Sequence, residues 1–162
     1  MANDPEPVLT PAIFYRDPKA ALPWLEAAFG LETSMLITDD DGKFAHGELS
    51  WRGAAISVGG ELASEALLGP AEMKSPASIG GVGTQFIRLT VEGDIDAHCA
   101  HARAAGARIT QAPKNEFYGA RTYRALDLEG HVWTFTKDIE DVSIAEMEKA
   151  SGLKIESREN HA

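Results

Sequence analysis

The sequence predicts an α+β protein in which two βαβββ modules form a cupped mixed sheet. Two observations support this prediction. The segment IFYRDPKAALPWLEAAFGL, residues 13–31, matches LTVEGDIDAHCAHARAAGA, residues 89–107, without a gap at an offset of 76. The segment LSWRGAAISVG, residues 49–59, then matches LDLEGHVWTFT, residues 126–136, at an offset of 77. Because self-similarity at a fixed spacing marks a repeated structural unit, both halves should fold in the same way.

Local signals give the order of elements in each unit. A β-rich run leads to a helix start at Asp17 in the first unit and at Asp94 in the second, since aspartate is a preferred N-cap. Pro18 stands in the first turn, where its missing N–H has no cost. Gly30 and Gly106 end the two helices. The expected strands cover residues 10–16, 33–38, 43–51 and 54–58, then residues 85–91, 108–111, 121–126 and 131–136.

Chain organisation follows from these units. Residues 1–138 are expected to form the two-module domain, with modules at 8–59 and 85–138 and a linker at 60–84 that is rich in Gly, Ala, Ser and Pro. Residues 139–162 should form a C-terminal helix and tail. In this region Ser143 and Glu146 have the spacing of a capping box, and Gly152 supplies the stop.

Composition narrows the classes of partner. The formal net charge of −10 argues against nucleic acid, because binding a phosphate backbone needs clustered Lys and Arg. No apolar run approaches membrane-spanning length, so no membrane association is expected. Cys99 is the single cysteine and forms no intrachain disulfide, which favours a reducing compartment and therefore the cytoplasm. We expect Cys99 to be a small core residue.

Two βαβββ units in one chain resemble the vicinal oxygen chelate superfamily, which includes glyoxalase I, extradiol dioxygenases, fosfomycin-resistance enzymes and bleomycin-resistance proteins. The resemblance covers residues 8–138, and YGARTYRALDLEGHVWTF, residues 118–135, is its most specific part because it looks like the closing motif of the family. The resemblance implies the fold and a ligand-binding cleft. It does not choose a chemistry, because members of this superfamily catalyse unrelated reactions or only bind.

The resemblance also implies where a metal would be held. In metal-dependent members the ligands occupy the positions that are filled here by Thr10, Ser57, Phe86 and Thr134. A catalytic divalent ion needs about three carboxylate, imidazole or thiolate ligands, and none of these four residues supplies one. We therefore expect no metal and no cofactor at these positions.

Strand parity predicts which residues face the cleft. Alternate strand residues point to opposite faces, so Thr134 should line the cleft while Trp133 and Phe135 pack on the helices. Phe86 and Arg88 should share the cleft face of their own strand, with Phe14 as an aromatic wall in the first unit. An inward arginine needs a partner, which is either a carboxylate in an internal salt bridge or an anionic ligand group.

Further polar residues have open assignments. Tyr118 and Arg121 follow a polar loop and are candidates for the rim of the cleft. His46 and Glu48 point the same way on one strand, either as a metal or proton-transfer pair or as a polar pair without chemistry. His98, on the second helix, is expected to be a flanking or exposed residue.

These observations predict a protein that binds a small aromatic or amphipathic molecule in its cleft without a metal. The ligand-binding candidates are Phe14, His46, Glu48, Ser57, Phe86, Arg88, Tyr118, Arg121 and Thr134. The alternative is a lyase or dioxygenase that uses another set of metal ligands, and a third interpretation is an interaction module with a vestigial cleft. A homodimer is expected, because proteins with this architecture commonly pair.

Overall fold

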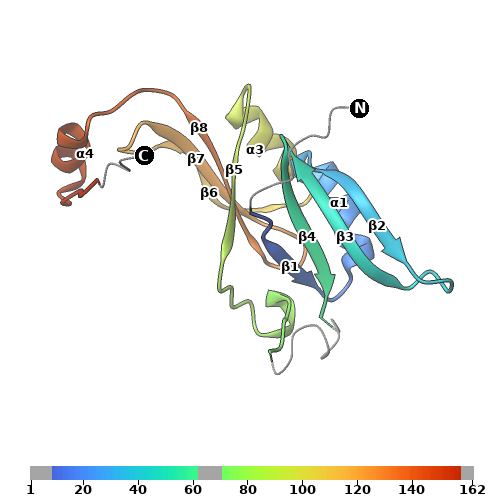
Figure 1. Cartoon of the computed structure of the whole chain (residues 1–162). Coiled ribbons are helices and arrows are strands. Elements are labelled where there is room, and N and C mark those ends of the chain that lie inside the picture. Colours follow the sequence, from blue (N-terminus) through green and yellow to red (C-terminus); the bar gives the residue numbers. More distant parts are fainter. Residues whose placement is uncertain (1–8, 62–70, 158–162) are drawn as a thin grey trace, which may run out of the picture.

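The computed structural model describes residues 9–61 and 71–157, and it confirms the α+β fold with two βαβββ units (Figure 1). The elements of the first unit are β1 (Ala12–Tyr15), α1 (Pro18–Phe29), β2 (Glu32–Thr38), β3 (Phe44–Trp51) and β4 (Ala54–Gly60). Those of the second are β5 (Phe86–Thr90), α3 (Ile95–Ala104), β6 (Arg108–Asn115), β7 (Ala120–Leu126) and β8 (Val132–Asp138). The remaining elements are η1 (Pro76–Ser78) and α4 (Ile144–Ser151). Part of the predicted linker, residues 62–70, lies outside the described residues.

The two units have the same sheet topology. The strand orders are β1-β4-β3-β2 and β5-β8-β7-β6, with parallel pairing of β1 to β4 and of β5 to β8 and antiparallel pairing elsewhere. Ala12 pairs with Ser57 in the first unit, and Arg88 pairs with Thr134 in the second. These pairs differ in number by 76 and 77, so the predicted repeat is confirmed. The strands form two four-stranded sheets rather than one continuous sheet.

The helix ends have the residues and geometry that the sequence predicts. Asp17 caps α1 by accepting a hydrogen bond from the backbone N–H of Ala20 at 3.0 Å. Asp94 caps α3 in the same way. Gly30 adopts the left-handed conformation (φ 75°) that ends α1, where a side chain would add strain. Within the described residues, no helix has the length and apolar character needed to span a membrane.

Each sheet packs one face against the helices and leaves the other face open. Trp133 and Phe135 on β8 are fully buried on the helix side, which confirms the predicted parity. The units join through the same core. Phe29, the last residue of α1, places its ring 5.4 Å from that of Trp133 and 4.9 Å from that of Phe135. A helix of the first unit therefore packs directly on the sheet of the second.

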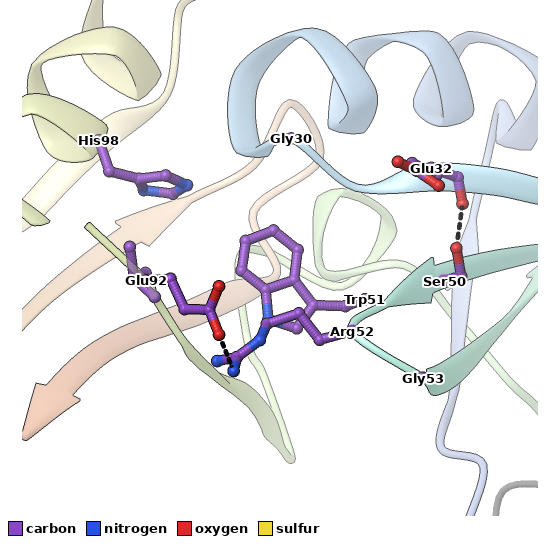
Figure 2. A pocket seen from close by; sticks show the side chains of 9 residues that line it. Gly30, Glu32, Ser50, Trp51, Arg52, Gly53, Glu92 and His98 are labelled. Atoms are coloured by element: carbon purple, nitrogen blue, oxygen red, sulfur yellow. Dashed lines mark hydrogen bonds and ion pairs between the residues drawn. The ribbon is translucent and has the colours of Figure 1, made fainter. Parts of the chain in front are cut away.

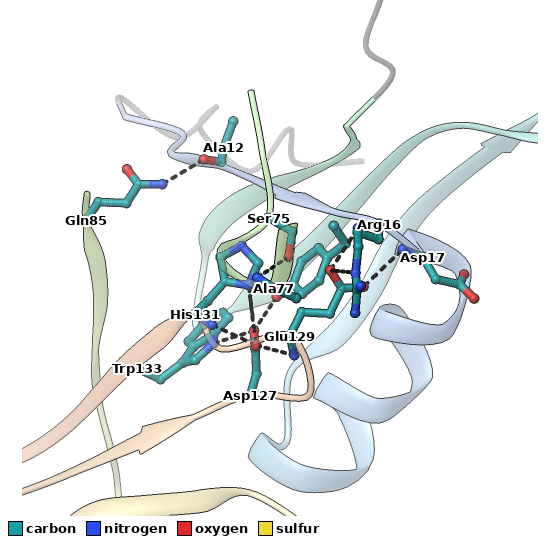
Figure 3. Close-up of polar contacts among 11 residues, drawn as sticks. Ala12, Arg16, Asp17, Ser75, Ala77, Gln85, Asp127, Glu129, His131 and Trp133 are labelled. Atoms are coloured by element: carbon teal, nitrogen blue, oxygen red, sulfur yellow. Dashed lines mark hydrogen bonds and ion pairs between the residues drawn. The ribbon is translucent and has the colours of Figure 1, made fainter. Parts of the chain in front are cut away.

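A buried carboxylate also joins the units (Figure 3). Asp127, in the turn before β8, accepts hydrogen bonds from the Tyr15 hydroxyl at 2.7 Å and from the Trp133 indole N–H at 3.0 Å. The backbone N–H groups of Glu129 and His131 donate to its other oxygen, each at 3.0 Å. Because Tyr15 lies on β1, this turn fixes the second unit to the first.

Glu129 makes a second link from the same turn. Its carboxylate accepts hydrogen bonds from the backbone N–H groups of Arg16 at 2.8 Å and Asp17 at 3.0 Å. These two residues connect β1 to α1, so Glu129 holds the start of the first helix. The acidic turn DLEG therefore has a structural role at the contact between the units.

The C-terminal helix α4 has the predicted capping box. The Ser143 side chain accepts from the backbone of Glu146, the Glu146 side chain accepts from the backbone of Ser143, and Gly152 ends the helix. No residue of α4 is buried. Figure 1 shows this helix beyond the end of β8, apart from α1 and α3.

Gly119, in the turn before β7, should tolerate no side chain. Its φ is +84°, and a Cβ there would lie 2.2 Å from the backbone oxygen of Glu140. We expect Gly119→Ala to lower the free energy of unfolding by about 2–5 kcal/mol, since it combines backbone strain with a clash, as measured by urea denaturation. Gly42→Ala is the matched control, because Gly42 has φ +75° but open space around it. Equal losses in the two variants would show that the clash has no effect.

Candidate functional site

The open face of the second sheet has a central row of polar side chains. Arg88 on β5 pairs with Thr134 on β8, Thr134 pairs with Arg124 on β7, and Arg124 pairs with Gln111 on β6. Paired residues in neighbouring strands point to the same face. Phe86 lies two residues before Arg88 on that face and is 61% exposed. The structure therefore brings together three of the predicted site residues, Phe86, Arg88 and Thr134.

Thr134 is buried without a hydrogen-bond partner. The residue is 5% exposed, and its Oγ1 is the one buried side-chain nitrogen or oxygen atom in residues 9–61 and 71–157 that makes no hydrogen bond. The next hydroxyls on this face differ, because those of Thr122 and Thr136 pair with each other at 3.3 Å. A buried polar group without a partner costs free energy, so Thr134 is an exception that needs a cause.

The first sheet presents a matching but different open face. Its central row pairs Ala12, Ser57, Glu48 and Met35 across β1, β4, β3 and β2. Ser57 occupies the place of Thr134, and Glu48 occupies the place of Arg124. The open faces of the two sheets therefore have charged residues of opposite sign at equivalent positions.

Phe14 and His46 complete the open face of the first sheet. The ring of Phe14 lies over Gly59, where an added Cβ would meet it at 2.6 Å, so the glycine makes room for the aromatic wall. His46 Nε2 lies 3.7 Å from Glu48 Oε1, and both side chains are part-exposed. Four further predicted site residues, Phe14, His46, Glu48 and Ser57, thus lie on the first sheet.

The two proposed rim residues lie elsewhere. Arg121 has the opposite parity to Arg124 and points to the helix side, where its Nε and Nη2 groups donate to the Asp96 carboxylate on α3 at 2.6 and 2.7 Å. Tyr118 lies in the turn before β7, with its ring against Phe117 at 5.3 Å. Sequence reasoning missed Arg124, which takes the place next to Thr134.

The residues present do not fit a metal ion at the positions that the resemblance indicates. Thr134 is flanked by two arginines, which repel a cation, and Ser57 has one carboxylate neighbour, Glu48. Across residues 9–61 and 71–157, no three His, Cys, Asp or Glu side chains come close enough to share a metal ion. The chain therefore lacks the usual metal ligands of metal-dependent members.

A separate cavity of about 530 Å³ lies where the units meet (Figure 2). Trp51, His98 and the Arg52–Glu92 ion pair line it. Several polar groups of this cavity have partners, since the Trp51 indole N–H donates to the backbone oxygen of Thr90 at 3.0 Å and Arg52 pairs with Glu92. The cavity is therefore better explained as part of the contact between the units than as a ligand site.

His98 corrects one prediction, because it is part-buried between the units rather than a surface residue. Burial lowers its pKa, so the ring is neutral near pH 7. Its Nε2 lies 3.0 Å from the backbone oxygen of Phe29, and its Nδ1 lies 2.6 Å from the Tyr123 hydroxyl. Because the backbone oxygen of Phe29 can only accept, Nε2–H donates to it and Nδ1 accepts from the Tyr123 hydroxyl, whose pKa is raised by burial. Cys99 is buried as predicted, and burial raises its thiol pKa.

The fold and the open sheet faces define the class of protein. The profile of the Glyoxalase/Bleomycin resistance protein/Dioxygenase superfamily matches residues 8–135, and the chain belongs to this superfamily. The chain is 29% identical over 150 residues to the uncharacterized protein Rv0887c of Mycobacterium tuberculosis, covering 93% of this chain and 85% of the relative. It is also 29% identical to the uncharacterized protein Mb0911c of Mycobacterium bovis, over 95% of that relative.

Solved structures share the fold. TioX from Micromonospora sp. ML1 is similar with a TM-score of 0.61 and 26% identity, over 81% of this chain and 98% of TioX. A glyoxalase/bleomycin resistance protein/dioxygenase family enzyme from Burkholderia phytofirmans PsJN has a TM-score of 0.61 and 19% identity, over 80% of this chain and 97% of the enzyme. These likenesses support the fold assignment and do not select a ligand.

Proposed function

We propose that the chain binds a small aromatic or amphipathic molecule, without a metal ion, on the open faces of its two sheets. The observation that carries this proposal is the composition of the central rows. Neutral hydroxyls of Ser57 and Thr134 stand where metal-dependent relatives carry ligands, and the aromatic rings of Phe14 and Phe86 lie beside them. Aromatic walls with a few oriented polar groups are typical of small-molecule sites.

This proposal is tested with a neutral aromatic probe. Protein dialysed against EDTA is titrated with 2-naphthylmethanol by calorimetry, and we expect binding to persist after metal removal. Phe86→Ala should weaken binding about 5-fold or more, because an exposed ring supplies stacking and apolar contact area. Phe117→Ala is the control, since Phe117 is also a part-exposed phenylalanine but lies in a turn. The proposal would be contradicted if the purified protein contained a stoichiometric metal and lost binding of the probe when EDTA removed that metal.

We also propose a homodimer in which a second copy of this chain packs on β2, at the outer edge of the first sheet. Large apolar side chains are exposed on this strand, namely Met35, Leu36 and Ile37. In the described residues, β1 and β5 each pair along one edge, and α4 buries no side chain. Exposed apolar surface of this kind marks an interaction site.

The expected result is a light-scattering mass of twice the 17.4 kDa of the chain. Met35→Glu should shift the protein toward the monomer, because it adds charge to an apolar contact. Lys19→Glu, an exposed change on α1, is the control and should leave the mass unchanged. A monomer mass for the parent protein at high concentration would contradict the dimer.

The alternative function is a lyase or dioxygenase that uses another set of metal ligands, for which His46 and Glu48 are candidates. These residues lie on one open face at 3.7 Å, so a third ligand from a partner subunit would complete a metal site. Elemental analysis of the purified protein separates the two functions, since a stoichiometric transition metal that is lost in His46→Ala would favour the enzyme. A third function, as an interaction module, predicts no small-molecule binding.

We also propose a cytoplasmic location, which the buried single cysteine supports.

A further inference from the structure

The central row of the second sheet has an unusual charge for this protein. The chain has 25 acidic and 15 basic residues, excluding histidine, yet Arg88 and Arg124 are both exposed on the same face. Among the described residues, no carboxylate lies within ion-pair distance of either guanidinium. The Arg124 side chain makes one hydrogen bond there, from Nη1 to Gln111 Oε1 at 3.1 Å.

The two arginines flank the buried hydroxyl. Thr134 is the paired residue of Arg88 on one side and of Arg124 on the other. Since neighbouring strands lie about 4.8 Å apart, the two arginine backbones are about 10 Å apart with Thr134 midway. Two long side chains can converge over the threonine from this spacing. Each guanidinium group can bind an oxyanion through two parallel hydrogen bonds, and the hydroxyl adds a further donor.

We propose that this row is an oxyanion site, in which Arg88, Arg124 and Thr134 hold the carboxylate, sulfonate or phosphate group of an aromatic ligand. The proposal rests on the function proposed above and specifies its ligand class. The anion supplies the acceptor that the Thr134 hydroxyl lacks and the counter-charge that both arginines lack. Phe86, on the same face two residues from Arg88, contacts the aromatic part. At a position where the family resemblance implies a metal ligand, this chain therefore places a hydroxyl between two cations.

The test compares probes that share a naphthalene ring. 2-Naphthoate, naphthalene-2-sulfonate and 2-naphthyl phosphate carry the three candidate oxyanions, and 2-naphthylmethanol is the neutral counterpart. We expect at least one anionic probe to bind about 10-fold or more tightly than the alcohol, because hydrogen bonds between charged groups are stronger than neutral ones. The tightest of the three identifies the oxyanion.

Variants assign the effect to the row. Arg88→Gln and Arg124→Gln should each weaken binding of the best anion about 10-fold or more and change binding of the alcohol less than about 2-fold. Thr134→Val should weaken binding of the best anion about 3- to 10-fold. It should not lower the melting temperature, since it removes a hydroxyl that has no partner in the fold. The matched control is Arg103→Gln, which replaces an exposed arginine on α3. This variant should change binding of neither the best anion nor the alcohol.

The outcomes separate this site from the general function. If the alcohol binds as tightly as every anion, or if the arginine variants behave like Arg103→Gln, the oxyanion site is wrong while aromatic binding stands. If no probe binds, both proposals fail. If Thr134→Val destabilises the fold, its hydroxyl has a structural partner and the proposed role of Thr134 is wrong.

Discussion

Phe29→Ala is expected to lower the free energy of unfolding by about 3–5 kcal/mol, the range for removing a fully buried aromatic side chain. The loss should be near the upper end, because this ring serves both units. It lies against Trp24 at 5.3 Å in its own unit and against Trp133 and Phe135 at 5.4 and 4.9 Å in the other. Urea denaturation followed by tryptophan fluorescence measures the change.

The same experiment tests whether the units fold together. With Phe29 in one shared core, the parent should unfold in a single transition, and the variant should do so at lower urea. Phe117→Ala is the control, since Phe117 is 40% exposed and makes only an edge-to-face contact with Tyr118 in a turn, and it should lower the free energy of unfolding by less than about 1 kcal/mol. A loss of that small size for Phe29→Ala would show that the units do not depend on this contact.

The helix ends and the strand parity were predictable because each depends on neighbours in sequence, and the repeat was predictable because the two halves share one sequence pattern. Asp17 and Gly30 act within one turn of their own helix, and Trp133 and Phe135 alternate with Thr134 along one strand. The strand after α3 was harder to predict. This strand covers Arg108–Asn115 and so continues beyond the predicted end at Gln111. The sequence did not show this because register shifts on either side of Gln111 interrupt the alternation of side chains between the two faces.

The candidate site was only partly predictable because it depends on pairing between strands. Thr134 and Arg88 follow from parity alone. Arg121 and Arg124 have opposite parity, and the pairing of Arg124 with Thr134 decides which of them joins the row. His98 was predicted to be a flanking or exposed surface residue. It is part-buried because the end of α1 in the other unit contacts it, and the pattern of α3 alone does not contain this contact.

Asp127→Ala is expected to lower the free energy of unfolding by about 3–5 kcal/mol, because it leaves several buried hydrogen-bond donors without an acceptor. These donors are the Tyr15 hydroxyl, the Trp133 indole N–H and the two backbone N–H groups of the turn. Asp127→Asn should cost less, since its amide oxygen keeps one acceptor. Thermal and urea unfolding of both variants measure the difference, and Asp40→Asn, on an exposed turn, is the control.

Asp127 should also make the fold sensitive to acid. Burial alone would raise its pKa, but hydrogen bonds and positive charge from His131, with hydrogen bonds from Tyr15 and Trp133, lower it overall. Because the pKa is lower in the folded than in the unfolded protein, the ionised carboxylate stabilises the fold above the unfolded value of about 3.9. This contribution is lost as the pH falls through the folded pKa. Between pH 7 and pH 3 the parent should therefore lose more stability than Asp127→Asn, whereas Asp40→Asn should follow the parent. Parallel pH profiles for the parent and Asp127→Asn would show that the pKa of Asp127 is the same in the folded and unfolded protein, so that its ionisation adds nothing to the link between the units.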